Sequence, residues 1–291
     1  MATLSGHGIC FVPGNESDRL VFRSDYDYFR VMTKKNILYE TRERKAFITL
    51  NRPEKRNALD DGIVKELTQC FLNAQKDPNV KVVILAGAGP AFCAGADLDY
   101  LQRLQSFDLD ENRADSRQLA GLFRTIYELR KPVIAMVNGP ALAGGCGLAS
   151  LCDFIIASKE RATFGYTEAR IGFIPAIVMI FLIKRLGEGR ARELVLRGHI
   201  ISAEEAESIQ LITKAVPEST LQNMVDGLAD ELIERNSLTA MGLSKEMLSK
   251  LQGLNLQDAL DFAANMNAAA RMTQDCKHGI SSFLNKEKIK W

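Results

Sequence analysis

The sequence predicts an α/β protein in which strand-strand-helix units repeat and a helical segment follows at the carboxyl end. Two extended runs, 37–41 and 46–50, are joined across a short charged turn and indicate a hairpin. Two apolar runs, 80–86 and 133–137, each end in a glycine-containing turn and lead into a helical pattern. After Pro175 the pattern is almost wholly helical. The sequence has no strict period, so the expected repetition is structural.

The first unit is the hairpin followed by a helix. Asn51, Arg52 and Pro53 end the second strand, and either Asp60 or Asp61 can cap the helix that follows. The apolar positions of this helix have helical spacing: Ile63, Val64, Leu67, Phe71 and Ala74.

Two later strands each lead into a helix through a loop of small residues. One loop is AFCAGADL at 91–98, and the other contains Asn138, Gly139 and Pro140 and then Gly144 and Gly145. Such loops let a ligand approach bare backbone N–H groups, and two loops together can direct two N–H groups at one oxygen atom. Close packing between strand and helix is the alternative interpretation of each glycine cluster.

Further elements follow from periodicity. Short strands are expected at 153–157 and 162–164. The segment 98–130 is helical and amphipathic, and its acidic portion 106–116 is expected to be mobile or solvated, although a catalytic acid there is the alternative. Later helical signals cover 176–186, 188–196, 202–208, 221–236, 238–251, 255–271 and 273–284.

Composition excludes several classes of function. The chain has 291 residues, 46% of them hydrophobic, with 37 Lys and Arg against 36 Asp and Glu. The near-neutral charge argues against a nucleic-acid partner, and no apolar run is long enough to span a membrane. The six cysteines form no CxxC pair, which favours reduced core thiols in a cytoplasmic protein. No metal site is expected, because no set of ligands with suitable spacing is present.

Three segments are expected along the chain. Residues 1–31 contain no apolar signal-peptide core and carry several acidic residues, so they are interpreted as a leader or extension of unknown role. Residues 32–200 contain the alternating strands and helices. Residues 201–291 form the helical carboxyl-terminal region.

Three motifs together resemble the enoyl-CoA hydratase/isomerase (crotonase) superfamily. They are RPEKRNALD at 52–60, AFCAGADL at 91–98 and ALAGGCGLASLCDFIIAS at 141–158, and the resemblance covers about residues 36–290. It implies a spiral of ββα units, a carboxyl-terminal helical region that assembles trimers or pairs of trimers, and an acyl-CoA thioester as substrate. No separate cofactor is implied, since coenzyme A is part of the substrate.

The resemblance also implies the site residues. The two N–H groups that stabilise the thioester oxygen correspond to Ala96 and Gly144, and Glu168 in FGYTEARIGFIPA corresponds to a catalytic glutamate. Glu168 precedes an apolar run, so partial burial and a raised pKa are expected.

Coenzyme A binding is assigned to the first two motifs. Arg52, Lys55 and Arg56 have the charge to meet the phosphates, and small residues permit backbone contact with adenine and pantetheine. The predicted substrate-binding and coenzyme A-binding residues are Lys55, Arg56, Ala58, Ala94, Asp97, Leu98 and Gly147.

One departure from the family pattern leaves the reaction open. Many hydratases of the family carry a second glutamate at the position of Gly147, whereas the isomerases use one glutamate at the position of Glu168. A hydratase is favoured, with methylglutaconyl-CoA of leucine breakdown as the suggested substrate. The alternatives are an enoyl-CoA isomerase and a catalytically weak acyl-CoA-binding scaffold.

Overall fold

A computed structural model describes residues 23–24, 27–28, 32–33 and 36–291. The expected leader, 1–31, lies outside the described residues except for β1 (Arg23–Ser24) and β2 (Asp27–Tyr28), which pair antiparallel. Within the described part, no helix combines the length and the apolar character needed to cross a bilayer.

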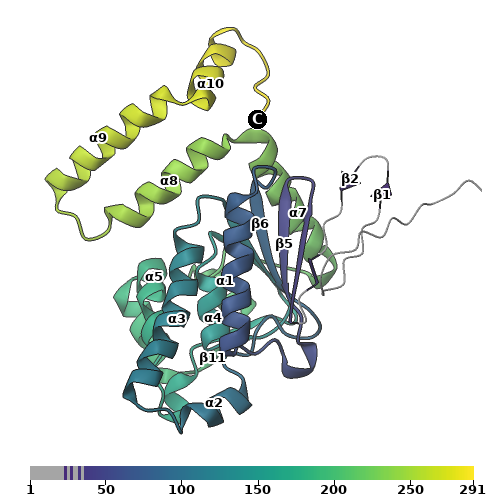
Figure 1. Ribbon diagram of the computed structural model, residues 1–291, viewed down its shortest axis with the longest axis vertical. Coiled ribbons are helices and arrows are strands. Elements are labelled where there is room, and N and C mark those ends of the chain that lie inside the picture. The colour runs from purple at the N-terminus through teal and green to yellow at the C-terminus, as the bar shows by residue number, and fades with distance from the viewer. Residues whose placement is uncertain (1–22, 25–26, 29–31, 34–35) are drawn as a thin grey trace, which may run out of the picture.

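A seven-stranded sheet forms the centre of the molecule (Figure 1). The predicted hairpin is confirmed, because β4 (Ile37–Arg42) pairs antiparallel with β5 (Lys45–Leu50). From β5 onward neighbouring strands run parallel. In sheet order the strands are β12 (Lys214–Val216), β9 (Phe154–Ser158), β7 (Val133–Val137), β6 (Val82–Gly87), β5, β4 and β3 (Met32–Thr33).

The central strands are buried on both faces, as expected for a parallel sheet covered by helices. In β6, Val83 and Leu85 face the larger core, while Val82 and Ile84 face a second cluster beneath α7 (Glu218–Arg235). Successive side chains of a strand point to opposite faces, so the continuous apolar run in β6 serves both cores.

The spiral arrangement arises from a second, smaller sheet. Its strand order is β11 (Ile200–Ser202), β10 (Thr163–Gly165) and β8 (Ala141–Leu142). β7 and β9 lie in the large sheet, whereas the strands that follow them, β8 and β10, lie in the small one. A parallel bridge between Cys93 and Ala141 extends the small sheet to the loop after β6. The predicted repetition of ββα units is therefore confirmed.

Helices surround the two sheets. Short 3-10 turns are η1 (Pro53–Lys55) and η2 (Glu168–Ile171). The helices on the larger core are α1 (Asp61–Lys76), α3 (Leu109–Tyr127), α4 (Gly144–Ser150) and α5 (Ala176–Arg197), with α2 (Leu98–Leu104) and α6 (Ala203–Ser208) beside them. At the top of Figure 1, α8 (Leu238–Leu251), α9 (Leu256–Met272) and α10 (Gln274–Leu284) extend beyond the sheets.

The observed elements can be compared with the remaining expectations. The segment 106–116 lies largely in the first half of α3, within the expected helical segment 98–130, and most of its residues are exposed, as expected for a solvated face. The helix begins with a capping box between Asp108 and Glu111. The boundary expected at 200 falls inside the small sheet, and β12 and α7 still pack with the large one. The two helices predicted at 176–186 and 188–196 are confirmed, because α5 is broken by the non-helical backbone of Gly187. The short strands β8, β11 and β12 were not predicted.

Three cations, the buried Lys81 and Lys131 and the partly buried Arg185, donate to carbonyl groups at helix carboxyl ends. Lys131 donates to the carbonyl oxygen of Ala74 in α1, and Lys81 to that of Ile233 in α7, each at 2.6 Å. Arg185 of α5 donates to the carbonyl oxygen of Ser150, the last residue of α4, at 3.0 Å. The last carbonyl groups of a helix receive no hydrogen bond from an N–H of the same helix. A cation that donates to them satisfies them, and the negative end of the helix dipole stabilises the cation.

The turn after β7 requires glycine at position 139. A Cβ atom there would lie 2.1 Å from the carbonyl oxygen of Pro90. We expect Gly139→Ala to lower the free energy of unfolding by about 3 kcal/mol, because backbone must move to accommodate the methyl group. Gly121→Ala is the matched control, since Gly121 in α3 has nothing within 4 Å; this change is expected to stabilise by about 1 kcal/mol. Urea unfolding of both variants measures the difference, and equal effects would contradict the packing argument.

Candidate active site

The loop 91–97 is held on one side by the first motif. The N–H of Leu59 donates to the carbonyl oxygen of Gly95 at 2.7 Å, and the N–H of Asp97 donates to the carbonyl oxygen of Leu59 at 2.8 Å. This is the pattern of a parallel bridge between Leu59 and Ala96. Because backbone groups alternate in direction along an extended segment, the N–H of Ala96 points away from Leu59.

The same loop is held on its other side by the turn before α4. The N–H of Cys93 donates to Pro140, and the N–H of Leu142 donates to the carbonyl oxygen of Cys93 at 2.9 Å. Gly145 packs directly on this carbonyl group, since a Cβ atom at 145 would lie 2.2 Å from the oxygen. Only glycine permits this approach.

These contacts bring the two predicted N–H donors together. A Cβ atom on Gly95 would lie 3.7 Å from the nitrogen of Gly144, so the Gly95–Ala96 peptide and Gly144 are close neighbours. Gly144 is the first residue of α4, and its N–H therefore has no acceptor within the helix. The preceding residue, Ala143, has φ of 48°, a strained conformation that sets the direction of the Gly144 N–H.

Glu168 begins η2, three residues after Gly165. The N–H of Ala143 donates to the carbonyl oxygen of Gly165 at 2.7 Å, which ties the Glu168 segment to the turn before α4. The side chain is buried, and Oε2 has no hydrogen-bond partner among the described residues. Burial raises the pKa of Glu168, as expected from the sequence. Burial raises the pKa of the Cys146 thiol in α4 to about 12, and the charge of Glu168 adds to this rise.

Position 147 has no room for a side chain. A Cβ atom on Gly147 would lie 2.2 Å from Cγ1 of Val178 and 3.2 Å from the ring of Phe123. Val178 in α5 and Phe123 in α3 are both buried in the larger core. A second carboxylate cannot be placed there unless α5 side chains move.

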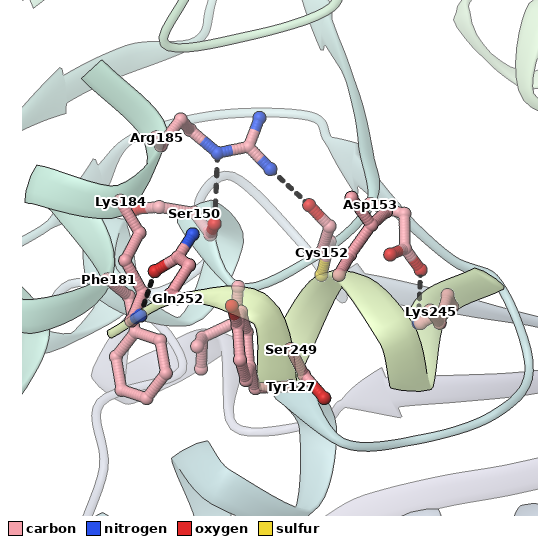
Figure 2. A pocket seen from close by; sticks show the side chains of 12 residues that line it. Tyr127, Ser150, Cys152, Asp153, Phe181, Lys184, Arg185, Lys245, Ser249 and Gln252 are labelled. Carbon is pink, nitrogen blue, oxygen red and sulfur yellow. Dashed lines mark hydrogen bonds and ion pairs between the residues drawn. The ribbon is translucent and has the colours of Figure 1, made fainter. Parts of the chain in front are cut away.

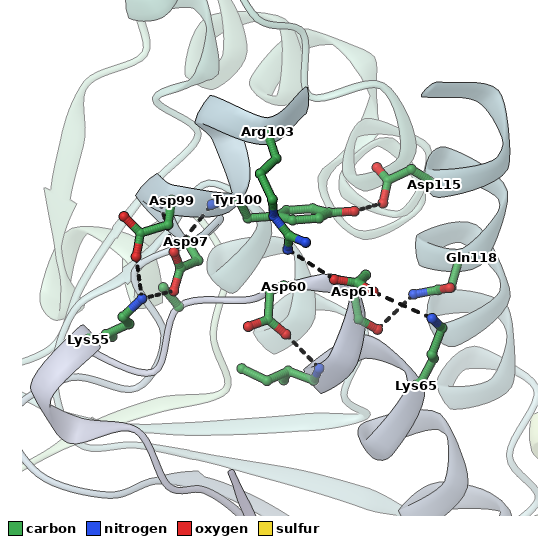
Figure 3. Close-up of polar contacts among 12 residues, drawn as sticks. Lys55, Asp60, Asp61, Lys65, Asp97, Asp99, Tyr100, Arg103, Asp115 and Gln118 are labelled. Carbon is green, nitrogen blue, oxygen red and sulfur yellow. Dashed lines mark hydrogen bonds and ion pairs between the residues drawn. The ribbon is translucent and has the colours of Figure 1, made fainter. Parts of the chain in front are cut away.

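A network of charges fixes the other end of the loop (Figure 3). Asp97 is buried, caps α2 through the N–H of Asp99, and accepts from Arg52 at 2.8 Å and Lys55 at 3.0 Å. Burial opposes ionisation, but these donors outweigh it and hold the pKa of Asp97 below its usual range. Asp97 therefore stays ionised and anchors the residue after Ala96.

The remaining predicted binding residues lie around this loop. Lys55 also pairs with the exposed Asp99 at 2.7 Å, while Arg56 is exposed and forms no ion pair with any described residue. Leu98 is 80% exposed. The N–H groups of Ala58 and Ala94 already donate, to the carbonyl oxygens of Lys55 and Arg56 respectively.

Asn57 is a site residue that the sequence reasoning missed. It is buried, has φ of 56°, and donates from Nδ2 to the carbonyl oxygens of Ala88 at 2.9 Å and Ala91 at 2.8 Å. Its Oδ1 accepts from the N–H of Arg52. The sequence does indicate a special position here, because the first motif contains an asparagine and asparagine tolerates a left-handed backbone conformation.

The acidic residues of 106–116 are engaged locally. Asp108 and Glu111 form the capping box, Asp110 pairs with Arg113 at 2.6 Å, and Asp115 accepts from the hydroxyl of Tyr100. The hydrogen bond from Tyr100 ties α2 to α3 (Figure 3).

A cavity of about 350 Å³ lies at the opposite end of α4 from Gly144 (Figure 2). Its lining contains none of the predicted site residues. At this cavity Arg185 donates to the carbonyl oxygens of Ser150 and Cys152, and Lys245 pairs with Asp153. These contacts around the cavity hold the carboxyl end of α4 in place.

Comparison with known proteins agrees with the geometry. Residues 40–291 match the family model described as enoyl-CoA hydratase/isomerase. The chain is 40% identical to a Thermus thermophilus protein named "Putative enoyl-CoA hydratase", covering 83% of this chain and 94% of that protein. It is 35% identical to the crotonyl-CoA hydratase of Syntrophomonas wolfei, covering 88% and 98%. The crystal structure of enoyl-CoA hydratase from Bacillus anthracis has a TM-score of 0.81, 31% identity, and coverage of 88% and 99%.

The charge network predicts a pH-dependent stability. Asp97→Asn keeps an oxygen for the α2 cap but loses the charge that Arg52 and Lys55 share, so we expect a loss of about 2 kcal/mol at pH 7. Because the pKa of Asp97 is lower in the folded state, its charge stabilises the fold at pH values above the ordinary Asp pKa of about 4. This contribution disappears as the pH falls through the pKa of the folded state. The difference from the wild type should therefore shrink in acid. Asp99→Asn, at a side chain 81% exposed, should change stability by less than about 0.5 kcal/mol. Urea unfolding from pH 7 to pH 3 tests both, and a pH-independent loss would exclude the ionic explanation.

Proposed function

Because the chain belongs to the enoyl-CoA hydratase/isomerase family, we propose that it is an enoyl-CoA hydratase that uses Ala96, Gly144 and Glu168. The observation that supports this most directly is the close approach of the Gly95–Ala96 peptide to the Gly144 nitrogen. The buried carboxyl of Glu168 follows a segment that the N–H of Ala143 ties to the turn before Gly144. Two backbone donors and one acid/base group are the minimum set for enolate chemistry on a thioester.

The proposed reaction places the thioester oxygen between the two N–H groups. Negative charge develops on this oxygen when water adds at C3, and preorganised donors stabilise it more than the neutral substrate. Loss of one such donor typically costs about 3 kcal/mol in activation free energy. Glu168 takes the proton of the attacking water and returns a proton to the α carbon. Burial raises its pKa in the direction of neutral pH, which favours a group that must both accept and donate a proton.

The packing at Gly147 favours a second candidate, an enoyl-CoA isomerase. Val178 and Phe123 fill the space beside this position, so the site offers Glu168 without a carboxylate at 147. Moving a proton between two carbons needs only one carboxylate, whereas hydration with one carboxylate requires Glu168 to act as base and then as acid. The hydratase remains the first proposal because the relatives named above are hydratases.

We propose methylglutaconyl-CoA, from leucine breakdown, as the substrate to test first. The runs at 141–158 and 164–176 support it through their resemblance to a bacterial branch with that assignment. Coenzyme A is proposed to lie along Lys55, Arg56, Ala58 and Ala94. Lys55 is partly exposed and its pairing with Asp99 is at the surface, so a phosphate can exchange for that carboxylate at little cost.

Self-association as trimers or pairs of trimers is part of the same proposal. The helices beyond the sheets expose large apolar side chains, which are unfavourable in water unless covered. They include Leu256, Leu260, Met272, Ile280, Phe283 and Leu284. Light scattering of the purified protein measures the assembly, and a monomer at micromolar concentration would contradict it.

The reaction is tested by comparing three thioesters with purified protein: crotonyl-CoA, methylglutaconyl-CoA and a 3-enoyl-CoA. Hydration of either 2-enoyl-CoA, followed by loss of absorbance of the conjugated thioester, supports the hydratase. Turnover of the 3-enoyl-CoA alone supports the isomerase. An absence of turnover with binding of coenzyme A thioesters supports the scaffold alternative.

Glu168→Gln should lower the turnover rate at least about a thousandfold, because the amide side chain cannot accept and return the proton. It should not destabilise the fold. Since the folded pKa of Glu168 is raised, the wild type loses stability as the pH rises from about 4.3 to the folded pKa, whereas the Gln variant does not. The variant should therefore match the wild type near pH 4 and exceed it at pH 8. Thermal unfolding and kinetics at both pH values provide the check, and full activity would remove Glu168 from its assigned role.

A further inference from the structure

Glu168 lies between a buried segment and an exposed one, and its carbonyl oxygen accepts from the N–H of Phe173 at 3.1 Å. The six residues that follow it, 169–174, are all exposed, and Gly172 among them has φ of 75°. Before it, Phe164 and Tyr166 are both about 1% exposed. Exposed segments with few buried contacts open most easily, so the position of the Glu168 carboxyl depends on the residues that precede it.

Tyr166 connects this segment to α4 by a buried hydrogen-bonded chain. Its hydroxyl lies 2.6 Å from Oγ of Ser150, and Oγ of Ser150 donates to the carbonyl oxygen of Cys146 at 2.6 Å. Since the single hydroxyl proton of Ser150 is used on Cys146, Tyr166 is the donor to Ser150. Cys146 is two residues after Gly144. These hydrogen bonds therefore link the segment that contains Glu168 to α4, the helix that carries one of the two N–H donors.

Ser150 is itself fixed from another direction. Its carbonyl oxygen accepts from Nε of Arg185 at 3.0 Å, as Figure 2 shows. Ser150 is therefore held through its backbone by α5 and through its side chain by Tyr166. Loss of the tyrosine hydroxyl would leave α4 anchored and would release only the segment that bears Glu168.

We propose that Tyr166 and Ser150 are positioning residues that set the distance between the Glu168 carboxyl and the Gly144 N–H. This inference rests on the proposed function of Glu168. Buried polar pairs fix one arrangement where apolar packing tolerates several, because each partner loses its hydrogen bond when it shifts. Displacement of a catalytic group by about 1 Å can reduce turnover by about a hundredfold.

The test is a cycle of Tyr166→Phe, Ser150→Ala and the double variant. Tyr166→Phe keeps the ring and removes one hydroxyl. We expect kcat to fall by about tenfold or more with KM within about twofold, because binding groups on the first two motifs are unaffected. The double variant should regain stability, since neither partner is left unsatisfied. Its kcat should stay as low as that of Tyr166→Phe.

The pH profile separates positioning from general stability. Burial keeps the pKa of Glu168 raised, and a looser segment admits water and lowers it. The pH at which kcat changes because Glu168 ionises should therefore be lower in Tyr166→Phe than in the wild type. Tyr127→Phe is the control, because this ring packs against Phe181 on α5 and should leave kcat and the profile unchanged.

A measurement without substrate distinguishes the two proposals. Amide hydrogen exchange of peptides covering 167–174 should be at least about tenfold faster in Tyr166→Phe, with 144–152 unchanged. Unchanged exchange, or a double variant with wild-type kcat, would overturn the positioning role. If the wild type has no turnover but exchange responds as expected, the proposed function fails and the structural link stands.

Discussion

The candidate site depends on one close contact, that between Gly145 and the carbonyl group of Cys93. A methyl group at position 145 would lie 2.2 Å from that oxygen, so α4 can approach the loop 91–97 only in the absence of a side chain. The approach brings Gly144 beside the Gly95–Ala96 peptide and leaves two N–H groups from distant parts of the chain facing one region. The hydrogen bonds from Leu59 and to Pro140 hold the loop in that place.

Two buried carboxyl groups near this contact have opposite environments. Asp97 has Arg52 and Lys55 against it, so its pKa is lowered and it remains charged as an anchor. Glu168 has no cation among the causes that shift its pKa, and burial alone raises it. The two environments move the pKa values of these carboxyl groups in opposite directions. Asp97 is therefore suited to a structural role, and Glu168 is suited to exchange protons.

Much of this arrangement follows from sequence patterns, and the failures have physical causes. The hairpin, the strands at 80–86 and 133–137 and a helix cap at Asp60 or Asp61 come from local periodicity and capping, which a sequence displays directly. The three proposed site residues came from resemblance to a family, since the contacts that join residues 59, 96 and 144 are not local. The short strands β8, β11 and β12 were missed, because two or three residues carry too little periodicity. The role of Asn57 depends on partners about thirty residues away.

The contact between Gly147 and Val178 also limits how this protein can diverge. Acquisition of a glutamate at 147 by one change would force α5 outward before any catalytic benefit appeared. A smaller residue at 178 must come first, and that intermediate would carry a void beside Phe123 with no compensating gain. A glutamate at position 147 is therefore accessible only through an intermediate that is less stable than the present protein.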